Sequence, residues 1–388
     1  MTYKVYLEAV NYKKRALDKH RKLRGKISVE LKDNLDTLDQ LSTYYTPGVG
    51  SVSKHIAENP ESARDLTWIN NSVAVISDGS SVLGLGNIGP QASLPVMEGK
   101  CMLFKKFAGI DAVPIVLKSQ SIKRIEKTIK QIAPSFGGIN LEDIAAPKCF
   151  EIENNLKDQL DIPIMHDDQH GTAVVVLAGL INALKIGNKD LAKCTVVVNG
   201  VGAAGVAIIK LIKKYEPKVK IIAVDSKGII SEKRKHLDFS KKYLLDKHKI
   251  IGNKQGGLAE AMDKSDIFIG VSRADVVDQA MVRSMNKDPI IFAMANPDPE
   301  IHPDEAKKAG ACVIATGRSD FPNQVNNALA FPGIFRGALD NHVNRITNKH
   351  KIEAAKTIAG LIKKPTADHI IPSVLDERLV PAIAKVII

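Results

Sequence analysis

Short apolar runs alternate with helical segments throughout the second half of the chain. The run at 162–168 precedes a stretch at 171–186 that is apolar nearly all round, and the run at 194–200 precedes a helical pattern at 203–215. Further apolar runs follow at 220–225, 266–272, 289–296 and 311–316. Strand-like runs that alternate with helices predict a parallel sheet with helices on both faces.

The first half of the chain predicts a smaller α/β unit. Residues 72–80 and 112–117 are rich in β-branched residues and predict strands. Between 121 and 136, isoleucines recur at helical spacing until a proline ends the pattern. The segment 137–144 is interpreted as a strand or a loop, and 147–160 as a short helix. This unit is expected to end near Leu160.

Both patterns together predict two domains, 1–160 and 161–388, the second ending in a mainly helical segment of about 60 residues. A chain of 388 residues, of which 44% are hydrophobic, has enough apolar material for two sizeable cores. The expected fold class is α/β, with a Rossmann-type doubly wound parallel sheet domain and a smaller α/β N-terminal domain.

Positive charge is concentrated near the N-terminus. Residues 1–30 hold nine Lys and Arg against three Asp and Glu, out of a net charge of +12. A helix is expected at 5–24. Because no aromatic interleaving and no Cys/His finger accompany the charge, we interpret it as a solvated surface helix and expect no contact with nucleic acid.

Cysteine use and hydropathy indicate the compartment. Four widely spaced cysteines are typical of reduced thiols in a cytoplasmic protein. No apolar run reaches the roughly 18–20 residues that a membrane span needs, and the N-terminus lacks the apolar core of a signal peptide. We therefore expect a cytoplasmic protein that does not contact a membrane.

Two copies of the pattern G-x-G-x-x-G occur, and their surroundings distinguish them. The copy at 200–205 follows an apolar strand, opens a helix, and is followed by Asp225 at the end of the next strand. These are the conditions for a dinucleotide-binding turn, in which the glycines let the backbone approach a pyrophosphate at the helix N-terminus. The expected cofactor-binding residues are Gly200, Gly202, Ala203, Ala204, Gly205, Asp225 and Asn296.

The copy at 84–89 is interpreted differently. Pro90 and Pro95 follow it, so no long helix is expected to open there. We expect a glycine-rich turn that shapes a pocket.

Two pairs of acidic residues are candidate metal ligands. Glu142 and Asp143 lie in one predicted strand or loop, and Asp167 and Asp168 end a predicted strand just before a helix. Oxygen ligands suit Mg²⁺ or Mn²⁺. His166 and His170 suggest zinc, but no cysteine lies nearby and the spacing is not H-E-x-x-H, so zinc is disfavoured. Each pair taken alone is also compatible with helix capping or a surface salt bridge.

Several polar residues near these elements have more than one interpretation. Lys100 closes a loop before an apolar run; it either extends its amine to solvent or, if buried, has a lowered pKa and becomes a candidate base. Tyr45 beside a proline turn is compatible with simple packing. The amides Asn296, Asn326 and Asn327 are candidates for binding a substrate carboxylate, or for turn formation.

Motifs from about residue 40 to 345 resemble those of malic enzymes, specifically the short bacterial kind. They include YTPGV, LGLGNIGPQASLPVMEGK, HDDQHGTA, NGVGAAGVA, ANPDPEI and TGRSDFPNQVNN, in that order. The resemblance implies oxidation of L-malate by NAD⁺ or NADP⁺ and its decarboxylation to pyruvate and CO₂ with a divalent cation. It also implies a homodimer, and a substrate and catalytic role for the N-terminal domain.

The resemblance assigns roles by motif. Tyr45 would be the general acid and Lys100 the general base, with Asp167 as the neighbour of the lysine. The metal ligands would be Glu142, Asp143 and Asp168. Asn296 and one of Asn326 or Asn327 would face the substrate. At Asp225 an acid favours NAD⁺ by binding the ribose 2′-hydroxyl, while nearby Lys227 leaves NADP⁺ use open.

Two other functions remain as alternatives. A metal-independent two-domain Rossmann dehydrogenase of another hydroxy or amino acid would share the nucleotide motif but would need no Mg²⁺ or Mn²⁺. A basic regulatory protein that binds nucleic acid and keeps a dinucleotide sensor would show salt-sensitive DNA binding and no malate turnover.

Overall fold

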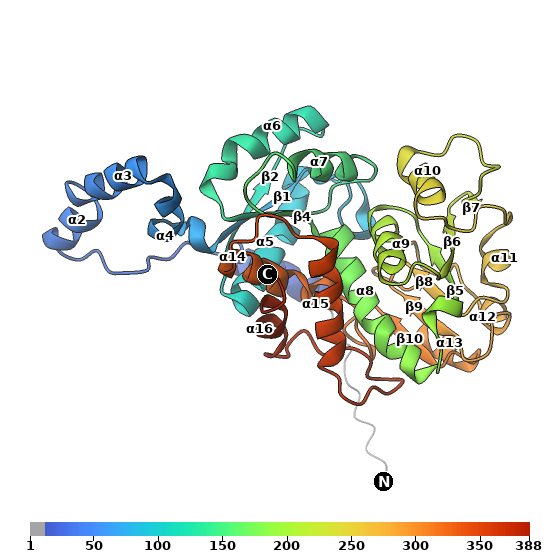
Figure 1. Ribbon diagram of the computed structural model, residues 1–388. Helices are drawn as coiled ribbons and strands as arrows, with labels where there is room; N and C mark the ends of the chain where they lie inside the picture. Colours follow the sequence, from blue (N-terminus) through green and yellow to red (C-terminus); the bar gives the residue numbers. More distant parts are fainter. Residues whose placement is uncertain (1–11) are drawn as a thin grey trace, which may run out of the picture.

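The structure is a computed structural model that describes residues 12–388 and contains two separate β-sheets surrounded by helices (Figure 1). Its larger hydrophobic core includes side chains from both sheets, and a second core covers the other face of the larger sheet. Along β5, Val196 and Val198 lie in the larger core and Val197 in the smaller one, because successive strand residues point to opposite faces.

The N-terminal sheet has the strand order β2-β1-β3-β4, and all its pairs are parallel. Its strands are β1 (Ser72–Ser77), β2 (Asp111–Val116), β3 (Gly138–Leu141) and β4 (Ile164–His166). The helices α5 (Pro90–Ala108), α6 (Ile122–Ile132) and α7 (Lys148–Leu156) lie between these strands in sequence. β4 begins after the boundary expected at residue 160 yet pairs with β3, so this sheet extends past Leu160. The division of the chain into two domains at that residue stays a prediction.

The second sheet has the order β10-β9-β8-β5-β6-β7, parallel except for the last pair. Its strands are β5 (Thr195–Asn199), β6 (Lys220–Asp225), β7 (Gly228–Ile229), β8 (Ile267–Gly270), β9 (Ile290–Ala293) and β10 (Val313–Thr316). Its helices are α9 (Ala203–Tyr215), α10 (Phe239–Asp246), α11 (Leu258–Met262), α12 (Gln279–Arg283) and α13 (Pro303–Lys308). The expected doubly wound parallel sheet with a second α/β unit is confirmed, apart from the short antiparallel edge strand β7.

Helix α5 corrects one expectation, because a long helix does open after the first glycine motif. Pro90 occupies its first turn, where the missing N–H costs nothing. Pro95 lies inside the helix, which nevertheless spans 19 residues in all. A stripe of buried residues at helical spacing holds it against the sheet: Ser93, Met97, Lys100, Cys101, Phe104 and Ala108. Burial of this face outweighs the loss of one backbone hydrogen bond.

Helix α8 (Asp167–Ile186) lies between the two sheets and packs on α9 and on α15 (Asn348–Gly360). In residues 12–388 it is the one helix long and apolar enough to span a membrane, yet 67% of that apolar window is buried inside the protein. Such burial is typical of a core helix. It begins four residues earlier than the expected helix at 171–186, so Asp167 and Asp168 form its first turn.

The remaining helices lie at the two ends of the chain. At the N-terminal end are α1 (Tyr12–Leu23), α2 (Leu38–Tyr44), α3 (Gly48–Glu58) and α4 (Ala63–Leu66), and at the C-terminal end α14 (Phe331–Asp340), α15 and α16 (Leu379–Ala384). Short 3₁₀ helices lie at Pro60–Ser62, Trp68–Asn71, Leu83–Leu85, Ala133–Ser135, Leu191–Lys193 and Asn327–Leu329. The first part of the helix expected at 5–24 lies outside the described residues. Figure 1 shows α2 and α3 projecting away from the body of the molecule.

Candidate active site

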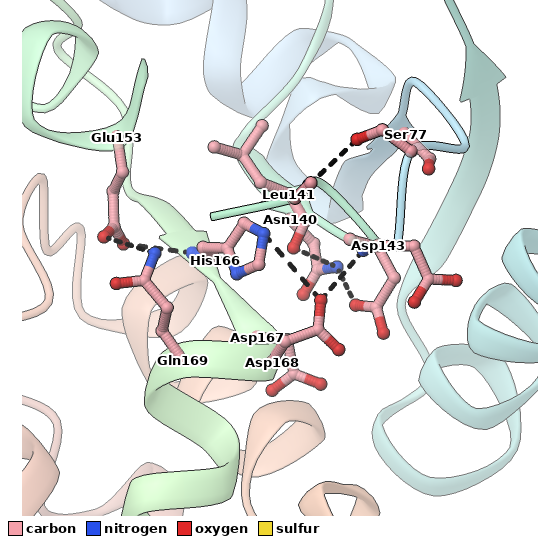
Figure 2. Close-up of polar contacts among 12 residues, drawn as sticks. Ser77, Asn140, Leu141, Asp143, Glu153, His166, Asp167, Asp168 and Gln169 are labelled. Atoms are coloured by element: carbon pink, nitrogen blue, oxygen red, sulfur yellow. Dashed lines mark hydrogen bonds and ion pairs between the residues drawn. The ribbon is translucent and has the colours of Figure 1, made fainter. Parts of the chain in front are cut away.

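The acidic residues gather where two neighbouring parallel strands end. Glu142 and Asp143 directly follow β3, and Asp167 and Asp168 directly follow β4. Because β3 and β4 are parallel and adjacent, their carboxyl ends lie at the same sheet edge. The backbone N–H of Asp143 donates to Oδ2 of Asp168 at 2.8 Å, which ties the two loops together (Figure 2).

Lys100 reaches this edge from α5. Its Nζ lies 2.7 Å from Oδ2 of Asp167 and 2.9 Å from Oε1 of Glu142. It also lies 4.3 Å from the ring centroid of Phe331. The side chain is buried, so the interpretation as a lysine that extends its amine to solvent is wrong.

The electrostatics of Lys100 differ from the expectation that burial would lower its pKa. Burial does disfavour the charged amine, but the carboxylates of Asp167 and Glu142 outweigh burial and raise the pKa. In this arrangement Lys100 is an ammonium ion. A base at this position must therefore lose a proton before it can accept one.

Asp167 is held against the backbone of its own helix. Its Oδ1 is buried and has no hydrogen-bond donor among the described residues. A Cβ at Gly171, one turn further along α8, would collide with this oxygen, so the close approach requires glycine there. Burial raises the pKa of Asp167 to about 7, against the opposing effect of Lys100.

Three carboxylates form a cluster that fits a divalent cation. Glu142, Asp143 and Asp168 each offer an oxygen, and these oxygens lie within 4.8 Å of one another. Oδ2 of Asp143 is buried without a donor in the part of the chain that the structure describes. Burial and the charges of Asp168 and Glu142 raise the pKa of Asp143 to about 9. A bound cation would remove this repulsion, and an all-oxygen set suits Mg²⁺ or Mn²⁺. We call Glu142, Asp143 and Asp168 the carboxylate cluster.

The two histidines do not join this cluster. Nε2 of His166 lies 3.8 Å from Oδ2 of Asp168, outside the set of converging ligand atoms. Nε2 of His170 instead lies 2.8 Å from Oε2 of Glu153, on the other side of β4. This placement agrees with the expectation that zinc is disfavoured.

The second glycine motif forms the turn between β5 and α9. Gly200 has a φ of +99°, Gly202 caps α9, and Ala203 and Ala204 are its first residues. A Cβ at Gly205 would collide with the carbonyl oxygen of Gly200, so the turn and helix can pack only with glycine there. A Cβ at Gly202 would meet no atom within 4 Å, which leaves open space beside the helix N-terminus.

Asp225 ends β6 as expected. Its carboxylate is bound by two cationic side chains that the sequence analysis missed. Its oxygens accept both guanidinium nitrogens of Arg234, at 2.8 and 3.1 Å, and Lys241 lies 3.2 Å away. The backbone N–H of Lys227 also donates to Asp225, at 2.9 Å. Despite partial burial, these partners lower the pKa of Asp225. Arg234 and Lys241 lie in a basic stretch without a motif, so no pattern identified them.

The candidate amides occupy different positions. The carbonyl of Asn296, in the exposed loop after β9, approaches Gly84 of the first glycine motif; a Cβ on Gly84 would lie 2.6 Å from it. Oδ1 of Asn326 accepts the N–H of Ala328 and caps a short 3₁₀ helix. The Cβ of Asn327 lies close to Gly171, beside the turn that carries Asp167.

One buried acid near Asn296 was also missed. Glu300 is fully buried and accepts the N–H groups of Ser272, at 2.8 Å, and Ala295, at 2.9 Å. It thereby joins the loop after β8 to the loop that presents Asn296. An isolated glutamate in a loop gives no sequence signal of burial.

Tyr45 is not brought to the carboxylate cluster by its own chain. It caps the end of α2 on the projecting N-terminal segment, and 66% of it is exposed. No residue of α2 or α3 is buried.

Comparison with known proteins gives consistent matches over nearly the whole chain. Two family profiles match in succession, "Malic enzyme, N-terminal domain" over residues 21–157 and "Malic enzyme, NAD binding domain" over residues 169–386. A bifunctional malic/malolactic enzyme of Bacillus subtilis is 50% identical over 97% of this chain and 92% of its own length. An NADP-dependent malic enzyme of Halomonas elongata is 43% identical over 96% of this chain and 92% of its own length. The solved structure of an NAD-dependent malic enzyme from Thermotoga maritima is similar with a TM-score of 0.92, at 46% identity, covering 96% of this chain and 98% of that chain.

Proposed function

The chain belongs to the malic enzyme family and catalyses oxidative decarboxylation of L-malate to pyruvate and CO₂ with NAD⁺ or NADP⁺; we propose that Lys100, Asp167 and the carboxylate cluster carry out this reaction. The observation that best supports these roles is the buried amine of Lys100 between Asp167 and Glu142, beside the converging oxygens of the cluster. A proton-accepting group and a cation site are thus adjacent.

The carboxylate cluster would hold Mg²⁺ or Mn²⁺. When bound, the cation supplies a Lewis acid that acidifies the C2 hydroxyl of malate and stabilises the negative charge left by loss of CO₂. The left-handed backbone of Asp143, with a φ of +54°, lets its N–H donate to Asp168 while its carboxylate stays in the cluster.

Lys100 accepts the proton of the C2 hydroxyl, and Asp167 makes this possible. Because the raised pKa of Lys100 keeps a proton on its amine, that proton must first move to a neighbour. Asp167 is hydrogen-bonded to the amine, has a second oxygen without a donor, and has a pKa raised to about 7. It is therefore the nearest acceptor for that proton, and the charge of a cation held by the carboxylate cluster would lower the pKa of Lys100 and favour the loss of the proton.

The turn at Gly200–Gly205 binds the dinucleotide. When bound, NAD⁺ or NADP⁺ supplies the acceptor for the hydride that leaves C2. The open space at Gly202 and the first N–H groups of α9 receive the pyrophosphate. We propose NAD⁺ as the preferred cofactor, because Asp225 disfavours a 2′-phosphate, with Arg234 and Lys241 weakening that discrimination.

The amides of Asn296 and of Asn326 or Asn327 bind the carboxylates of malate. Asn327 is the better placed of the adjacent pair, because Oδ1 of Asn326 already caps the 3₁₀ helix while Asn327 lies beside the turn of Asp167.

Tyr45 delivers the proton to C3 in a second copy of the chain, so the enzyme works as a homodimer. The apolar side chains of the projecting segment are exposed: Leu38, Leu41, Tyr44, Val49 and Val52. A cleft of about 860 Å³ between α5, α14 and α16 is lined by Val374, Leu379 and Pro381 and reaches Ala328, next to Asn327. An apolar segment with no partner in its own chain and an apolar cleft beside the site are complementary surfaces.

The proposed chemistry is tested by assaying NADH and NADPH formation from L-malate in the cytoplasmic fraction and with the purified protein. We expect Mn²⁺-dependent formation of pyruvate, and loss of both activity and Mn²⁺ binding in Asp168→Asn but not in the exposed control Asp161→Asn. Full activity after removal of divalent cations would favour the metal-independent dehydrogenase instead.

The role of Tyr45 is tested by mixing two inactive variants, Tyr45→Phe and Lys100→Ala. If each site takes Tyr45 from the partner, random hybrid dimers regain about a quarter of the wild-type activity. No recovery in dimers shown to have exchanged subunits would mean that Tyr45 acts within its own chain or not at all.

A further inference from the structure

A basic cleft of about 730 Å³ shares no lining residue with the carboxylate cluster or the nucleotide turn. It is formed by α7, α9, α10, the first turn of α8 and the start of α15. Six cationic side chains line it: Lys157, Lys210, Lys213, Lys214, Arg345 and Lys351. Among the described residues, Glu153 is the one carboxylate in its lining. Its volume suits a small molecule.

Lys351 is the unusual member of this set. It is only 7% exposed, yet within residues 12–388 its amine has no hydrogen bond and no ion pair within 4 Å. A lysine side chain this little exposed loses most of its hydration, so such groups normally have a bonded partner. Lys157 and Lys214 are exposed and solvated, whereas Lys351 keeps only a small exposed area and lines the cleft.

Glu153 attracts the ammonium of Lys351 but forms no ion pair with it within 4 Å, because the Glu153 oxygens face other groups. Oε1 accepts the backbone N–H of His166 at 3.0 Å, and Oε2 lies 2.8 Å from Nε2 of His170 and 3.4 Å from the amide of Gln169. Figure 2 shows Glu153 facing His166 and Gln169, on the side of β4 opposite the carboxylate cluster. Its contacts fasten the start of α8.

The lysines of the cleft repel one another. Burial lowers the pKa of Lys351 to about 8; the charge of Glu153 opposes this shift, and the charges of Lys157 and Lys210 add to it. Lys210 lies over the rings of Phe150 and Tyr243, 5.7 and 5.1 Å from their centroids, and its pKa is also lowered, chiefly by burial. An anion between these amines would relieve the repulsion and give Lys351 its missing partner.

We propose that this cleft binds a small organic polyanion, a molecule with at least two phosphate or carboxylate groups, at a site separate from those for malate and the dinucleotide. Arg345 already pairs with Asp158 at 2.9 Å, and Lys213 donates to the carbonyl of Val219 at 2.6 Å. The remaining lysines still match several negative charges better than one, with Lys351 and Lys210 as the main contacts. The inference does not depend on the roles proposed for Lys100 or Tyr45.

The test is isothermal titration of the whole protein at pH 7, freed of metal, at about 0.15 M salt to screen weak surface contacts. Saturating NADH fills the nucleotide turn. Inorganic pyrophosphate and tricarballylate are the two probes, one for phosphate and one for carboxylate. The variants are Lys351→Gln and Lys210→Gln. The control is Lys349→Gln, an exposed lysine on the same helix that does not line the cleft.

We expect one of the probes or both to bind, and each cleft variant to weaken binding by about tenfold or more, as loss of a charged hydrogen bond does. The affinity of the control variant for the probes should stay within about twofold of the wild-type value, because an exposed charge outside the cleft contributes little. Binding of one probe alone identifies the ligand class. Absence of binding at millimolar concentration of both probes, equal affinity in the cleft variants, or loss of binding when NADH is present would overturn the proposal.

Discussion

The amine of Lys100 lies 2.7 Å from Oδ2 of Asp167, although 67 positions separate the two residues in the chain. The contact joins α5, which follows the first strand of the N-terminal sheet, to the first turn of α8, which follows the last. It also places the amine beside Glu142 of the carboxylate cluster. The proton chemistry that we propose depends on this single junction between helices.

Replacing Lys100 with alanine should lower kcat by about 10²–10⁴-fold, the range typical of a lost general base. Affinity for NADH, followed by its fluorescence, should change little because the nucleotide turn lies on the other sheet. Lys105→Ala, on the exposed face of the same helix, is the matched control. A kcat near that of the wild type in Lys100→Ala would remove the lysine from the mechanism.

Alanine at two glycines of the nucleotide turn should have different effects. Gly205→Ala forces a Cβ into the carbonyl of Gly200, so we expect the Tm to fall by about 5 °C or more. Gly202→Ala meets no protein atom within 4 Å, so its Tm should be unchanged while its Kd for NADH rises, because the new methyl group occupies the pyrophosphate's path. Thermal melts measure the effect of each variant on stability, and NADH titrations measure its effect on nucleotide binding. Unchanged NADH affinity in Gly202→Ala would place the pyrophosphate elsewhere.

Removing Arg234 should sharpen the preference for NAD⁺. Arg234→Ala frees the carboxylate of Asp225 from its bidentate partner and removes a cation from the end of β6. We expect the ratio of kcat/KM for NAD⁺ to that for NADP⁺ to rise by about tenfold, as for loss of one charged contact. Lys233→Ala, the exposed neighbour, should leave the ratio unchanged. A ratio that falls in Arg234→Ala would show that the arginine serves NAD⁺ binding.

Lys351→Met should stabilise the protein at neutral pH. The pKa of Lys351 is lowered from 10.5 to about 8 in the folded protein, so between these values the unfolded chain binds more protons and wild-type stability rises with pH. Below pH 8 the amine is charged in both the folded and the unfolded protein, so the full cost of burying that charge reduces the free energy of unfolding. The free energy of unfolding of the variant should therefore exceed that of the wild type by up to about 3 kcal/mol at pH 7. This difference in free energy should become smaller towards pH 10. Urea denaturation of both proteins at the two pH values measures it; a gap that does not change with pH would contradict the prediction.

Local patterns predicted most strands and helices because they depend on alternation and spacing. The segment 203–215 is a helix and 220–225 a strand with the expected bounds, since strand, glycine turn and amphipathic helix follow one another directly. The helix after the first glycine motif was missed for a related reason. The two prolines are local features that disfavour a helix. Burial of one face of α5 against the sheet favours the helix, but that burial is a tertiary effect.

Residue type and position identified the acidic pairs and Lys100 as candidates. The charge state of Lys100 could not be predicted in this way. Whether a lysine is a free base or an ammonium depends on which charges surround it, and those charges come from two separate segments, the loop after β3 and the first turn of α8. Arg234, Glu300 and Lys351 had no distinguishing neighbours in the sequence. Their importance arises from partners, or from the lack of one, that only packing decides.

By itself, the sequence determined the α/β class, the nucleotide turn with its acid at Asp225 and the set of ionisable residues available for catalysis, because these depend on short-range spacing and residue chemistry. The tertiary structure decided which of those groups meet: it brought Lys100 to Asp167 and Glu142, left Tyr45 exposed on a projecting segment, and placed the largely buried Lys351 in a cleft with other lysines. Contacts between distant segments depend on how helices and sheets pack, and no local pattern encodes that packing.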